Sequence, residues 1–291
     1  MQSVQCVFEA IGTHWQIDIY QKITDDKKSV IFDIIKNRIE EFEKTYSRFR
    51  EDSLFYEISQ KEGDYKFPDD AKELFDLYQK LYDITGGLVT PLIGNLLSDI
   101  GYDREYTFEK KNISKVKSID EVYNYKYPNL IVKEKTILDF GGIGKGYIID
   151  IVGKILEDNN INSYCVDAGG DIRYRTEIEE SLNIGLENPI DMTQVLGVYK
   201  LKNRSICGSS GSRRSWGDYN HIVNPETLSS PREILAVWAI ADKTVVADAM
   251  TTCLFFTSPQ ILSRHFDFEY AIVYKDFSLE YSKNFEGEFF T

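Results

Sequence analysis

The chain is organised around the stretch Leu138-Asp139-Phe140-Gly141-Gly142-Ile143-Gly144-Lys145-Gly146-Tyr147, in which an apolar run ends in a carboxylate and four glycines follow within six residues. Apolar residues then recur at helical spacing from Ile148 to Leu156. The pattern predicts a strand, a glycine-rich turn and the N-terminus of a helix. Glycine allows a ligand to approach the main chain closely, and free N–H groups at a helix start favour anions.

This turn does not match the two common phosphate-binding motifs. A P-loop would need glycine at position 139 and serine or threonine at 146, where Asp139 and Gly146 stand. The dinucleotide-binding fingerprint would need glycine at position 149, which is isoleucine. Taken alone, the turn is therefore either a tight structural turn or a phosphate site.

Length and charge restrict the class of function. With 291 residues, of which 42% are hydrophobic and 28% charged, the chain is long enough for one large or two medium globular domains. Its net charge of -13 argues against a nucleic-acid-binding protein, which needs a basic face. An anionic small ligand would need local compensation from a lysine, an arginine, a helix terminus or a metal ion.

Cysteine spacing and hydropathy exclude further classes. The four cysteines, at positions 6, 165, 207 and 253, form no Cys-x-x-Cys pair, so neither a zinc site nor a disulfide framework is indicated. No apolar run is long enough to span a membrane, and the first residues lack the pattern of a secretion signal. We expect a cytoplasmic chain without a membrane segment, unless an export leader was removed before residue 1.

The periodicity of apolar residues predicts a series of helices and strands. Helices are expected over residues 25–46 and 69–84. Two more are expected to end at about residues 100 and 158, another to begin near Thr244, and a final one to lie shortly before residue 269. Strands are expected at 2–9, 14–20, 163–171, 182–187, 195–201, 204–208, 233–241, 269–274 and 278–281. Composition favours a solvated loop at 47–53 and a surface excursion without evident chemistry at 101–135.

Two further features carry chemistry. Asp248 and Thr252 are four residues apart in a predicted helix and share one face, where a carboxylate and a hydroxyl offer hard oxygens to Mg²⁺. The alternative is a surface carboxylate beside a threonine bonded to its own helical turn. His221, ahead of Ile-Val-Asn-Pro, is the most suggestive of the three histidines, although a lone histidine is more often structural.

Five motifs occur together in a known order and spacing. They are Asp-Phe-Gly-Gly-Ile-Gly-Lys-Gly-Tyr (139–147), Val-Asp-Ala-Gly-Gly-Asp (166–171), Ser-Ser-Gly-Ser-Arg-Arg-Ser-Trp (209–216), His-Ile-Val-Asn-Pro-Glu-Thr (221–227) and Ala-Asp-Ala-Met-Thr-Thr (247–252). With Ile11-Gly12-Thr13-His14-Trp15 before them, they make the chain resemble the ApbE family from about residue 5 to 275. Members of that family are FAD:protein FMN transferases.

The resemblance implies a composition for the site. A Mg²⁺ ion would be held by Asp248, Thr252 and the main-chain carbonyl of Gly142. FAD, the substrate, would contact Ile11, Phe49, Leu88, Val89, Thr90, Asp139, Lys145 and Ile222. His221 would serve as a base or hold a phosphate.

The resemblance also implies the reaction. A threonine or serine hydroxyl of an acceptor protein would attack the phosphorus of the FMN half of FAD, and AMP would leave. Such a transfer depends mainly on positioning and on stabilisation of charge, which the metal ion and Lys145 would supply.

This chain departs from the common family pattern at four positions. Ile11 replaces the usual methionine, and Thr90 stands where many members have aspartate. Leu92 replaces a threonine, and Asn224 replaces the aspartate before proline. These departures affect the contacts to the flavin, whereas the three expected metal ligands are all present.

The resemblance implies an α+β fold with mixed, largely antiparallel sheets flanked by helices. We expect residues 1–291 to form one such domain, as a single body or as two closely packed sublobes. The same site would serve an FAD pyrophosphatase that yields FMN and AMP, and the sequence does not separate the two enzymes. A non-catalytic flavin-binding protein is the third hypothesis. The Asp248 and Thr252 pair argues against it, because carriage alone needs no cation at the pyrophosphate.

Overall fold

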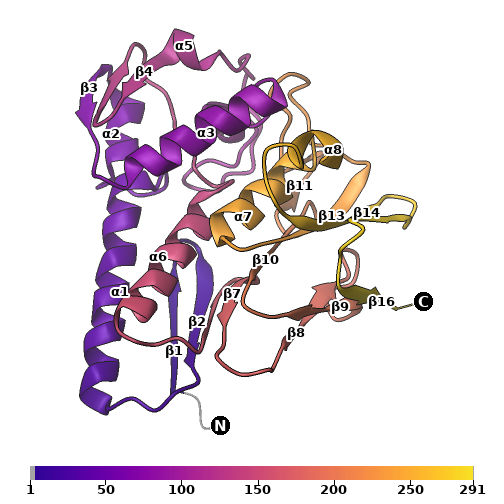
Figure 1. Cartoon of the computed structure of the whole chain (residues 1–291). Helices are drawn as coiled ribbons and strands as arrows, with labels where there is room; N and C mark the ends of the chain where they lie inside the picture. Colours follow the sequence, from indigo (N-terminus) through magenta and orange to yellow (C-terminus); the bar gives the residue numbers. More distant parts are fainter. Residues whose placement is uncertain (1–3, 291) are drawn as a thin grey trace.

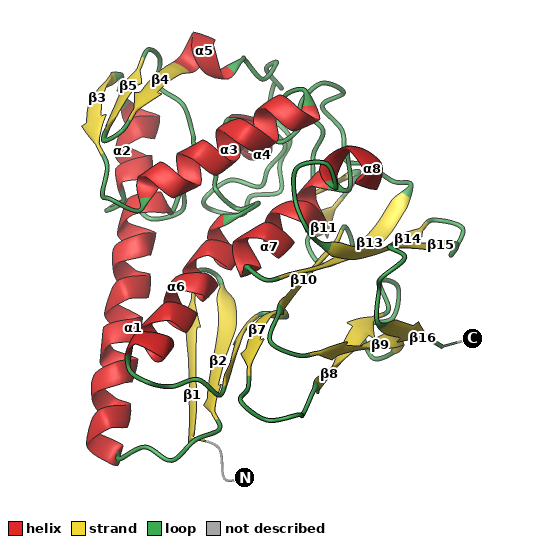
Figure 2. Cartoon of the chain, viewed as in Figure 1, coloured by secondary structure: helices red, strands yellow, loops and turns green. Residues whose placement is uncertain are grey.

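A large antiparallel sheet forms the centre of the computed structural model, which describes residues 4–290 (Figures 1 and 2). Its eight strands lie in the order β1-β2-β6-β7-β10-β13-β14-β15, and each neighbouring pair is antiparallel. The strands are β1 (Val4–Ala10), β2 (Thr13–Ile19), β6 (Tyr164–Ala168), β7 (Asp171–Arg175), β10 (Ser205–Ser210), β13 (Ile234–Ala241), β14 (Glu269–Tyr274) and β15 (Leu279–Tyr281).

Helices cover one face of this sheet. They are α1 (Asp25–Tyr46), α6 (Gly144–Asp158), α7 (Thr244–Cys253) and the short α8 (Pro259–Leu262). Helix α1 starts where the Thr24 side chain accepts a hydrogen bond from the Lys27 N–H, and it buries Ile31, Ile35 and Ile39 at four-residue spacing. Helix α6 packs on β6 and β7, and α7 packs on β10 and β13, so that α6 and α7 lie side by side.

The opposite face of the sheet carries a second, smaller layer. Strands β8 (Leu182–Glu187), β9 (Val195–Leu201) and β16 (Gly287–Phe289) form an antiparallel sheet in the order β16-β9-β8. Leu186, Tyr199 and Leu201 from this layer share an apolar core with Ile206 and Trp238 of the large sheet. The large sheet is therefore covered on both faces.

The remaining elements form a lobe at one end of the helices, drawn at the top of Figure 1. It contains α2 (Leu54–Gln60), α3 (Ala71–Thr85), α4 (Ile93–Asp99), α5 (Ile119–Val122) and the sheet of β3 (Gly63–Lys66), β5 (Asn129–Val132) and β4 (Tyr123–Lys126). The strands β11 (Ser215–Trp216) and β12 (Tyr219–Asn220) form a separate two-stranded ribbon. Buried residues of this lobe and of α1, α6 and α7 belong to one continuous core.

The expected α+β class with antiparallel sheets and flanking helices is confirmed. The helix at 25–46 and the strands at 182–187, 195–201 and 269–274 agree with the prediction residue for residue. Residues 2–3 of the first predicted strand lie outside the described residues. Within residues 4–290, no helix is long and apolar enough to cross a membrane.

The prediction was wrong ahead of the glycine-rich turn, because residues 133–140 belong to no strand. Helix α6 begins at Gly144, so Gly144 and Gly146 lie inside its first turn rather than ahead of it. The prediction also missed α2, β3, β16 and the β11–β12 ribbon. These are short elements, and local periodicity is a weak signal over so few residues.

Candidate active site

One cavity of about 430 Å³ gathers segments that are far apart in the sequence. Its walls come from the β1–β2 turn, the loops after α1 and α3, the glycine-rich stretch, the end of β10, residues 221–223 and α7. All twelve site residues predicted from the sequence line it: Ile11, Phe49, Leu88, Val89, Thr90, Asp139, Gly142, Lys145, His221, Ile222, Asp248 and Thr252. Their individual roles remain predictions.

A close contact between α6 and α7 positions Asp248. A Cβ atom on Gly146 would lie 2.5 Å from the Thr244 carbonyl oxygen and 2.7 Å from the Asp248 Cβ, so only glycine fits there. The Gly146 N–H donates a hydrogen bond of 2.8 Å to Asp248 Oδ2. Asp150 of α6 accepts hydrogen bonds of 2.9 Å from the Thr244 and Val245 N–H groups at the start of α7. Helix α6 therefore fixes both the start of α7 and its carboxylate.

The donors at this contact fit a hard divalent cation. Asp248 is 5% exposed, and Thr252 follows one helical turn later beside the cavity. The Thr252 Oγ1 lies 3.4 Å from the position of a Cβ on Gly142, which brings that residue's main chain next to the hydroxyl. A carboxylate, a hydroxyl and a main-chain carbonyl are all oxygen donors of the kind that Mg²⁺ prefers. Burial and the Asp171 carboxylate raise the pKa of Asp248, so an ionised Asp248 gains from a nearby cation.

Lys145 and Asp171 form an ion pair beside Asp248. Asp171 also accepts a hydrogen bond of 3.2 Å from the Gly208 N–H. Burial lowers the pKa of Lys145, but the charges of Asp171 and Asp248 outweigh burial and raise this pKa above its ordinary value, so the ammonium stays charged. The sequence analysis quoted Asp171 within a motif without giving it a role. Its signal was its position directly after a glycine turn.

Cys207 completes a group of three possible ligands with Asp171 and Asp248, whose ligating atoms all lie within 4.8 Å of one another. Burial, with Asp171 nearby, raises the pKa of the Cys207 thiol well above its usual range. Metals bind the thiolate, so the protonated thiol of Cys207 is a poor ligand at neutral pH. The oxygen atoms of Asp248 and Thr252 remain the better donors.

Arg48 is a site residue that the sequence analysis missed. Its side chain is 4% exposed, and its Nε donates to Asp139 Oδ2 at 2.5 Å. The guanidinium lies 4.1 Å from the centre of the Phe49 ring and 5.0 Å from that of Tyr102. Its Nη2 is buried without a hydrogen-bond partner among the described residues. The expectation of a solvated loop at 47–53 is therefore wrong for Arg48, because its partner Asp139 lies ninety-one positions away.

Aromatic side chains line the cavity beside Arg48. Phe49 stacks on Tyr106 with ring centres 5.4 Å apart and an interplanar angle of 2°, and Tyr102 packs on Trp216 at 5.5 Å. Tyr102 and Tyr106 belong to the excursion at 101–135, for which no chemistry was expected; that expectation is corrected, since both line the cavity. Stacked rings of this kind offer a flat apolar surface to a planar ligand.

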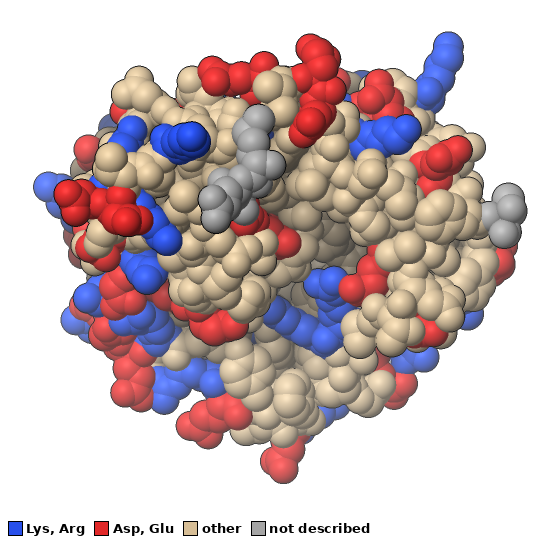
Figure 3. All heavy atoms as spheres, turned by 90° about the horizontal axis from the view of Figure 1, so that it is seen from below, with Lys and Arg blue, Asp and Glu red and all other residues tan. Residues whose placement is uncertain are grey.

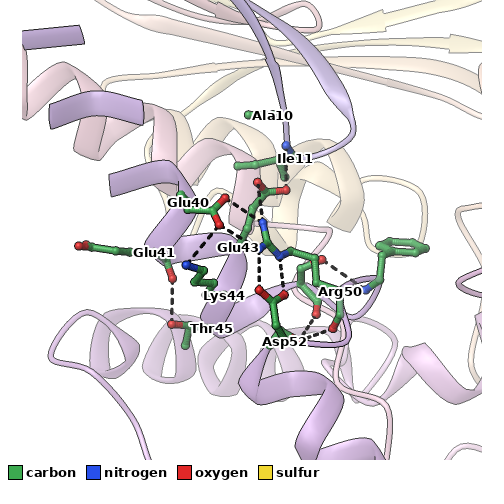
Figure 4. A network of polar contacts seen from close by, with 12 residues as sticks. Ala10, Ile11, Glu40, Glu41, Glu43, Lys44, Thr45, Arg50 and Asp52 are labelled. Atoms are coloured by element: carbon green, nitrogen blue, oxygen red, sulfur yellow. Dashed lines mark hydrogen bonds and ion pairs between the residues drawn. The ribbon is translucent and has the colours of Figure 1, made fainter. Parts of the chain in front are cut away.

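The β1–β2 turn is held against α1 by a network of charged groups (Figure 4). The Ile11 N–H donates to Glu43 Oε1 at 3.1 Å, while Arg50 binds both carboxylate oxygens of Glu40 and both of Asp52. Ile11 has a φ of 53°, a left-handed conformation that is unfavourable for a β-branched residue. The network therefore fixes a strained turn at the cavity wall and ties the loop carrying Phe49 to α1.

His221 is neutral at physiological pH. Burial, helped by the charge of Arg214, lowers the pKa of His221 to about 4. Its Nδ1 is buried and has no hydrogen-bond partner among residues 4–290. The backbone N–H donates to the Arg214 carbonyl oxygen at 3.2 Å, which holds the residue at the wall beside Ile222. A neutral imidazole with an unused nitrogen is able to accept a hydrogen bond or a proton.

The surface charge is uneven around one face of the molecule. Seen from below, the molecule is hollowed near its centre, and Lys and Arg side chains gather at the hollow (Figure 3). Within the cavity itself the cationic groups are Lys145 and four arginines, at positions 48, 50, 213 and 214. Glu43, Asp139 and Asp248 line the same cavity, so cations outnumber acids there by five to three although the chain carries a net charge of -13.

Comparison with known proteins gives consistent matches. A sequence model of the ApbE family matches residues 11–269. The FAD:protein FMN transferase of Escherichia coli K12 is 21% identical over 276 residues, which is 87% of this chain and 78% of that protein. The FAD:protein FMN transferase of Vibrio cholerae is 24% identical over 270 residues, or 84% of this chain and 78% of that protein.

Solved structures share the fold. The flavin transferase ApbE from Vibrio cholerae superposes with a TM-score of 0.81 at 19% identity, covering 97% of this chain and 96% of that one. The ApbE protein from Thermotoga maritima gives a TM-score of 0.83 at 22% identity, with 98% and 99% covered. The α+β architecture described above is therefore that of these proteins.

Proposed function

This chain belongs to the ApbE family, as its motifs indicated, and we propose that it is an FAD:protein FMN transferase. It transfers the FMN half of FAD to a threonine or serine hydroxyl of an acceptor protein, releases AMP and depends on Mg²⁺. The observation that carries the proposal is the convergence of twelve predicted residues on one cavity, where oxygen donors and cationic side chains lie together.

The cavity walls match two parts of the substrate in chemistry, a planar ring system and the pyrophosphate. The stacked rings of Phe49 and Tyr106 suit a planar aromatic group, and the partnerless Nη2 of Arg48 suits an anionic or hydroxyl oxygen. Lys145 supplies a fixed positive charge for the pyrophosphate. Asp248, Thr252 and the Gly142 carbonyl would hold Mg²⁺, which supplies Lewis-acid stabilisation of phosphate oxygens.

The reaction exchanges the phosphoanhydride bond of FAD for a phosphoester bond to the acceptor. The acceptor oxygen bonds to the phosphorus of the FMN half, the P–O bond to the bridging oxygen breaks, and AMP leaves with that oxygen. The hydroxyl proton leaves to a base, for which neutral His221 at the cavity wall is the candidate. Lys145 and Arg48 neutralise the charge that develops on the phosphates.

Incubation with FAD, Mg²⁺ and a candidate acceptor domain tests the proposal. Covalent flavin fluorescence on the acceptor, with release of AMP, is the expected result. AMP and FMN without labelling would indicate a pyrophosphatase, and bound but unchanged FAD would indicate a carrier.

The metal assignment has its own test. Asp248→Ala should abolish turnover, whereas Asp242→Ala, which removes a carboxylate that is 88% exposed just before α7, should leave turnover near wild type. Full activity of Asp248→Ala, or of the wild-type protein in excess EDTA, would refute the assignment. Circular dichroism of both variants separates a loss of ligand from a loss of fold.

A further inference from the structure

A groove of about 320 Å³ adjoins the cavity, between the large sheet and the free edge of β8. The two hollows share five lining residues, namely Gly169, Gly208, Ser209, Ser210 and Arg213. We propose that this groove binds the segment of the acceptor protein that carries the reacting hydroxyl, in an extended conformation alongside β8. This inference rests on the proposed transferase function and identifies the surface that would receive its second substrate.

The shared wall lies on the side of the cavity where phosphoryl transfer would occur. Ser209 Oγ donates a hydrogen bond of 2.9 Å to Thr251 Oγ1, which in turn donates one of 2.8 Å to the Asp248 carbonyl oxygen. The Gly208 N–H is bonded to Asp171, the partner of Lys145. A group that enters through the groove and passes this wall therefore arrives next to the proposed metal ligand rather than at the stacked aromatic rings.

The main chain around the groove has unused hydrogen-bonding capacity. Strand β8 pairs with β9 from Leu182 to Glu187, and no strand of the described chain pairs with its other edge. Strand β10 meets β7 only at Ser205 and Ile206, so its end has β13 on one side and no described strand on the other. Unpaired strand edges are the surfaces to which extended segments add as a further strand.

The side chains of the groove favour a protein segment over a small anion. Its lining is mixed, because apolar side chains (Ile172, Ile184, Ile206, Ala236 and Trp238) lie beside polar ones (Asn183, Glu187, Ser209 and Ser210). Arg213, the cation at its border, is already bound to both carboxylate oxygens of Glu187 at 3.1 and 2.9 Å and to the Gly169 carbonyl. The groove thus offers backbone pairing and apolar contact, which an extended peptide with alternating side chains uses and a free phosphate does not.

The acceptor would need such an entrance of its own. In the proposed reaction FAD fills the cavity, so the hydroxyl has to reach the phosphorus from a direction that FAD does not occupy. An edge strand positions a side chain in a fixed register, which places one hydroxyl at the shared wall while its neighbours face the groove or solvent. Positioning of this kind supplies much of the rate of a bimolecular transfer.

Two matched substitutions on one face of β8 test the proposal. Ile184 and Leu182 are both half-buried and pack on the same apolar core, but only Ile184 lines the groove. The probe is a pool of synthetic peptides with one fixed central threonine and randomised neighbours, labelled with FAD and Mg²⁺ and read by mass spectrometry. Ile184→Arg should lower peptide labelling by about tenfold or more, since a charge replaces an apolar contact, while Leu182→Arg should change it by less than about threefold.

Two additional measurements separate the possible outcomes. The KM for FAD in acceptor-independent AMP release should be unchanged in Ile184→Arg, and in wild type the best-labelled peptide should slow amide exchange of residues 182–187. Labelling by folded Ile184→Arg at the wild-type rate would overturn the groove assignment. AMP release by wild type without labelling of any peptide, or absence of FAD binding and turnover in wild type, would instead overturn the proposed transferase function. If Ile184→Arg fails to fold, unchanged exchange of residues 182–187 in wild type with bound peptide would overturn the proposal.

Discussion

The contact between α6 and α7 leads to a sharp prediction for Gly146→Ala. A Cβ at this position would meet the Thr244 carbonyl oxygen at 2.5 Å and the Asp248 Cβ at 2.7 Å. Alanine is favoured over glycine inside a helix by roughly 0.5–1 kcal/mol, so helix propensity alone would predict a more stable protein. The clash acts against this gain and falls on backbone atoms that no change of rotamer can move.

The structure sets the size of the displacement. Extending the 2.5 Å contact to an ordinary 3.4 Å requires α7 to move by 3.4 - 2.5 = 0.9 Å, away from hydrogen bonds that Asp150 makes to its first turn. Overpacking of this kind costs about 1–3 kcal/mol, which leaves a net destabilisation of about 0–2.5 kcal/mol after the gain in helix propensity. The same shift moves Asp248, and a misplacement of about 1 Å at a reacting centre costs about a hundredfold in rate.

Two assays on two variants distinguish a clash at the α6–α7 contact from a general effect of alanine on helix stability. Urea denaturation gives the free energy of unfolding, and AMP release from FAD gives the turnover rate. Gly144→Ala is the control for stability, because its Cβ would meet the Phe42 ring at 3.5 Å and the Phe140 Cβ at 3.7 Å, which are both ordinary contacts. It should be as stable as wild type or more stable by up to about 1 kcal/mol. A Gly146→Ala protein with wild-type turnover and increased stability would refute the proposed dependence of Asp248 on the helix contact.

Three further predictions concern single side chains at the cavity. Thr252→Val should raise the Mg²⁺ concentration for half-maximal turnover by about tenfold or more, whereas Thr252→Ser, which keeps the hydroxyl, should stay near wild type in the same titration; equal effects of the two would contradict the ligand assignment. Arg48→Ala should lower the free energy of unfolding by about 3–5 kcal/mol, because it leaves the Asp139 carboxylate, which is 13% exposed, with the Gly141 N–H as its one remaining partner among the described residues. Arg50→Ala removes more exposed ion pairs and should cost about 1 kcal/mol or less, and similar losses in both variants would argue against a strong pair at Arg48. Burial lowers the pKa of His221 from 6.5 in the unfolded chain to about 4 in the folded protein, so between these values the unfolded chain binds more protons and stability falls as the pH falls. The free energy of unfolding of wild type minus that of His221→Asn should therefore decrease by about 3 kcal/mol from pH 6.5 to pH 4. A difference that stays flat over this window would show that His221 is not buried in its neutral form.

Local patterns predicted those helices and strands whose own residues carry the apolar periodicity. The helix at 25–46 carries six periodic apolar residues over its length, and the strand at 269–274 is an apolar run after its first residue, Glu269, so both were predicted at their observed bounds. Helix α6 was different, because Gly144 and Gly146 oppose helix formation locally. Gly146 is nevertheless helical, since α7 comes too close there for any side chain. That reason lies about a hundred residues further along the chain and is invisible to a local pattern.

The candidate site shows the same limit at the level of single side chains. Asp248 and Thr252 were recognisable as a pair because helical spacing places them on one face. Arg48 was not, because a charged loop of that composition is usually solvated and its burial depends on Asp139. Tyr106 was missed because its stacking on Phe49 joins two loops that only the folded chain brings together. The family motifs compensated in part, since they record such long-range contacts as order and spacing.

The glycine-rich stretch itself acts differently from the anion cradle that its composition first indicated. Six of its N–H groups are used inside the protein: Asp139 donates to the Pro91 carbonyl, Gly141 to the Asp139 side chain, Ile143 and Gly144 to the Phe140 carbonyl, Gly146 to Asp248 and Tyr147 to the Ile143 carbonyl. Donors engaged in this way do not bind a phosphate without breaking an existing bond. Positive charge for a pyrophosphate therefore comes from the cationic side chains of the cavity, with Lys145 beside Asp248, and from a cation on Asp248. The glycines contribute by their small size, which allows Gly142 to lie beside Thr252 and α7 to approach α6 at Gly146.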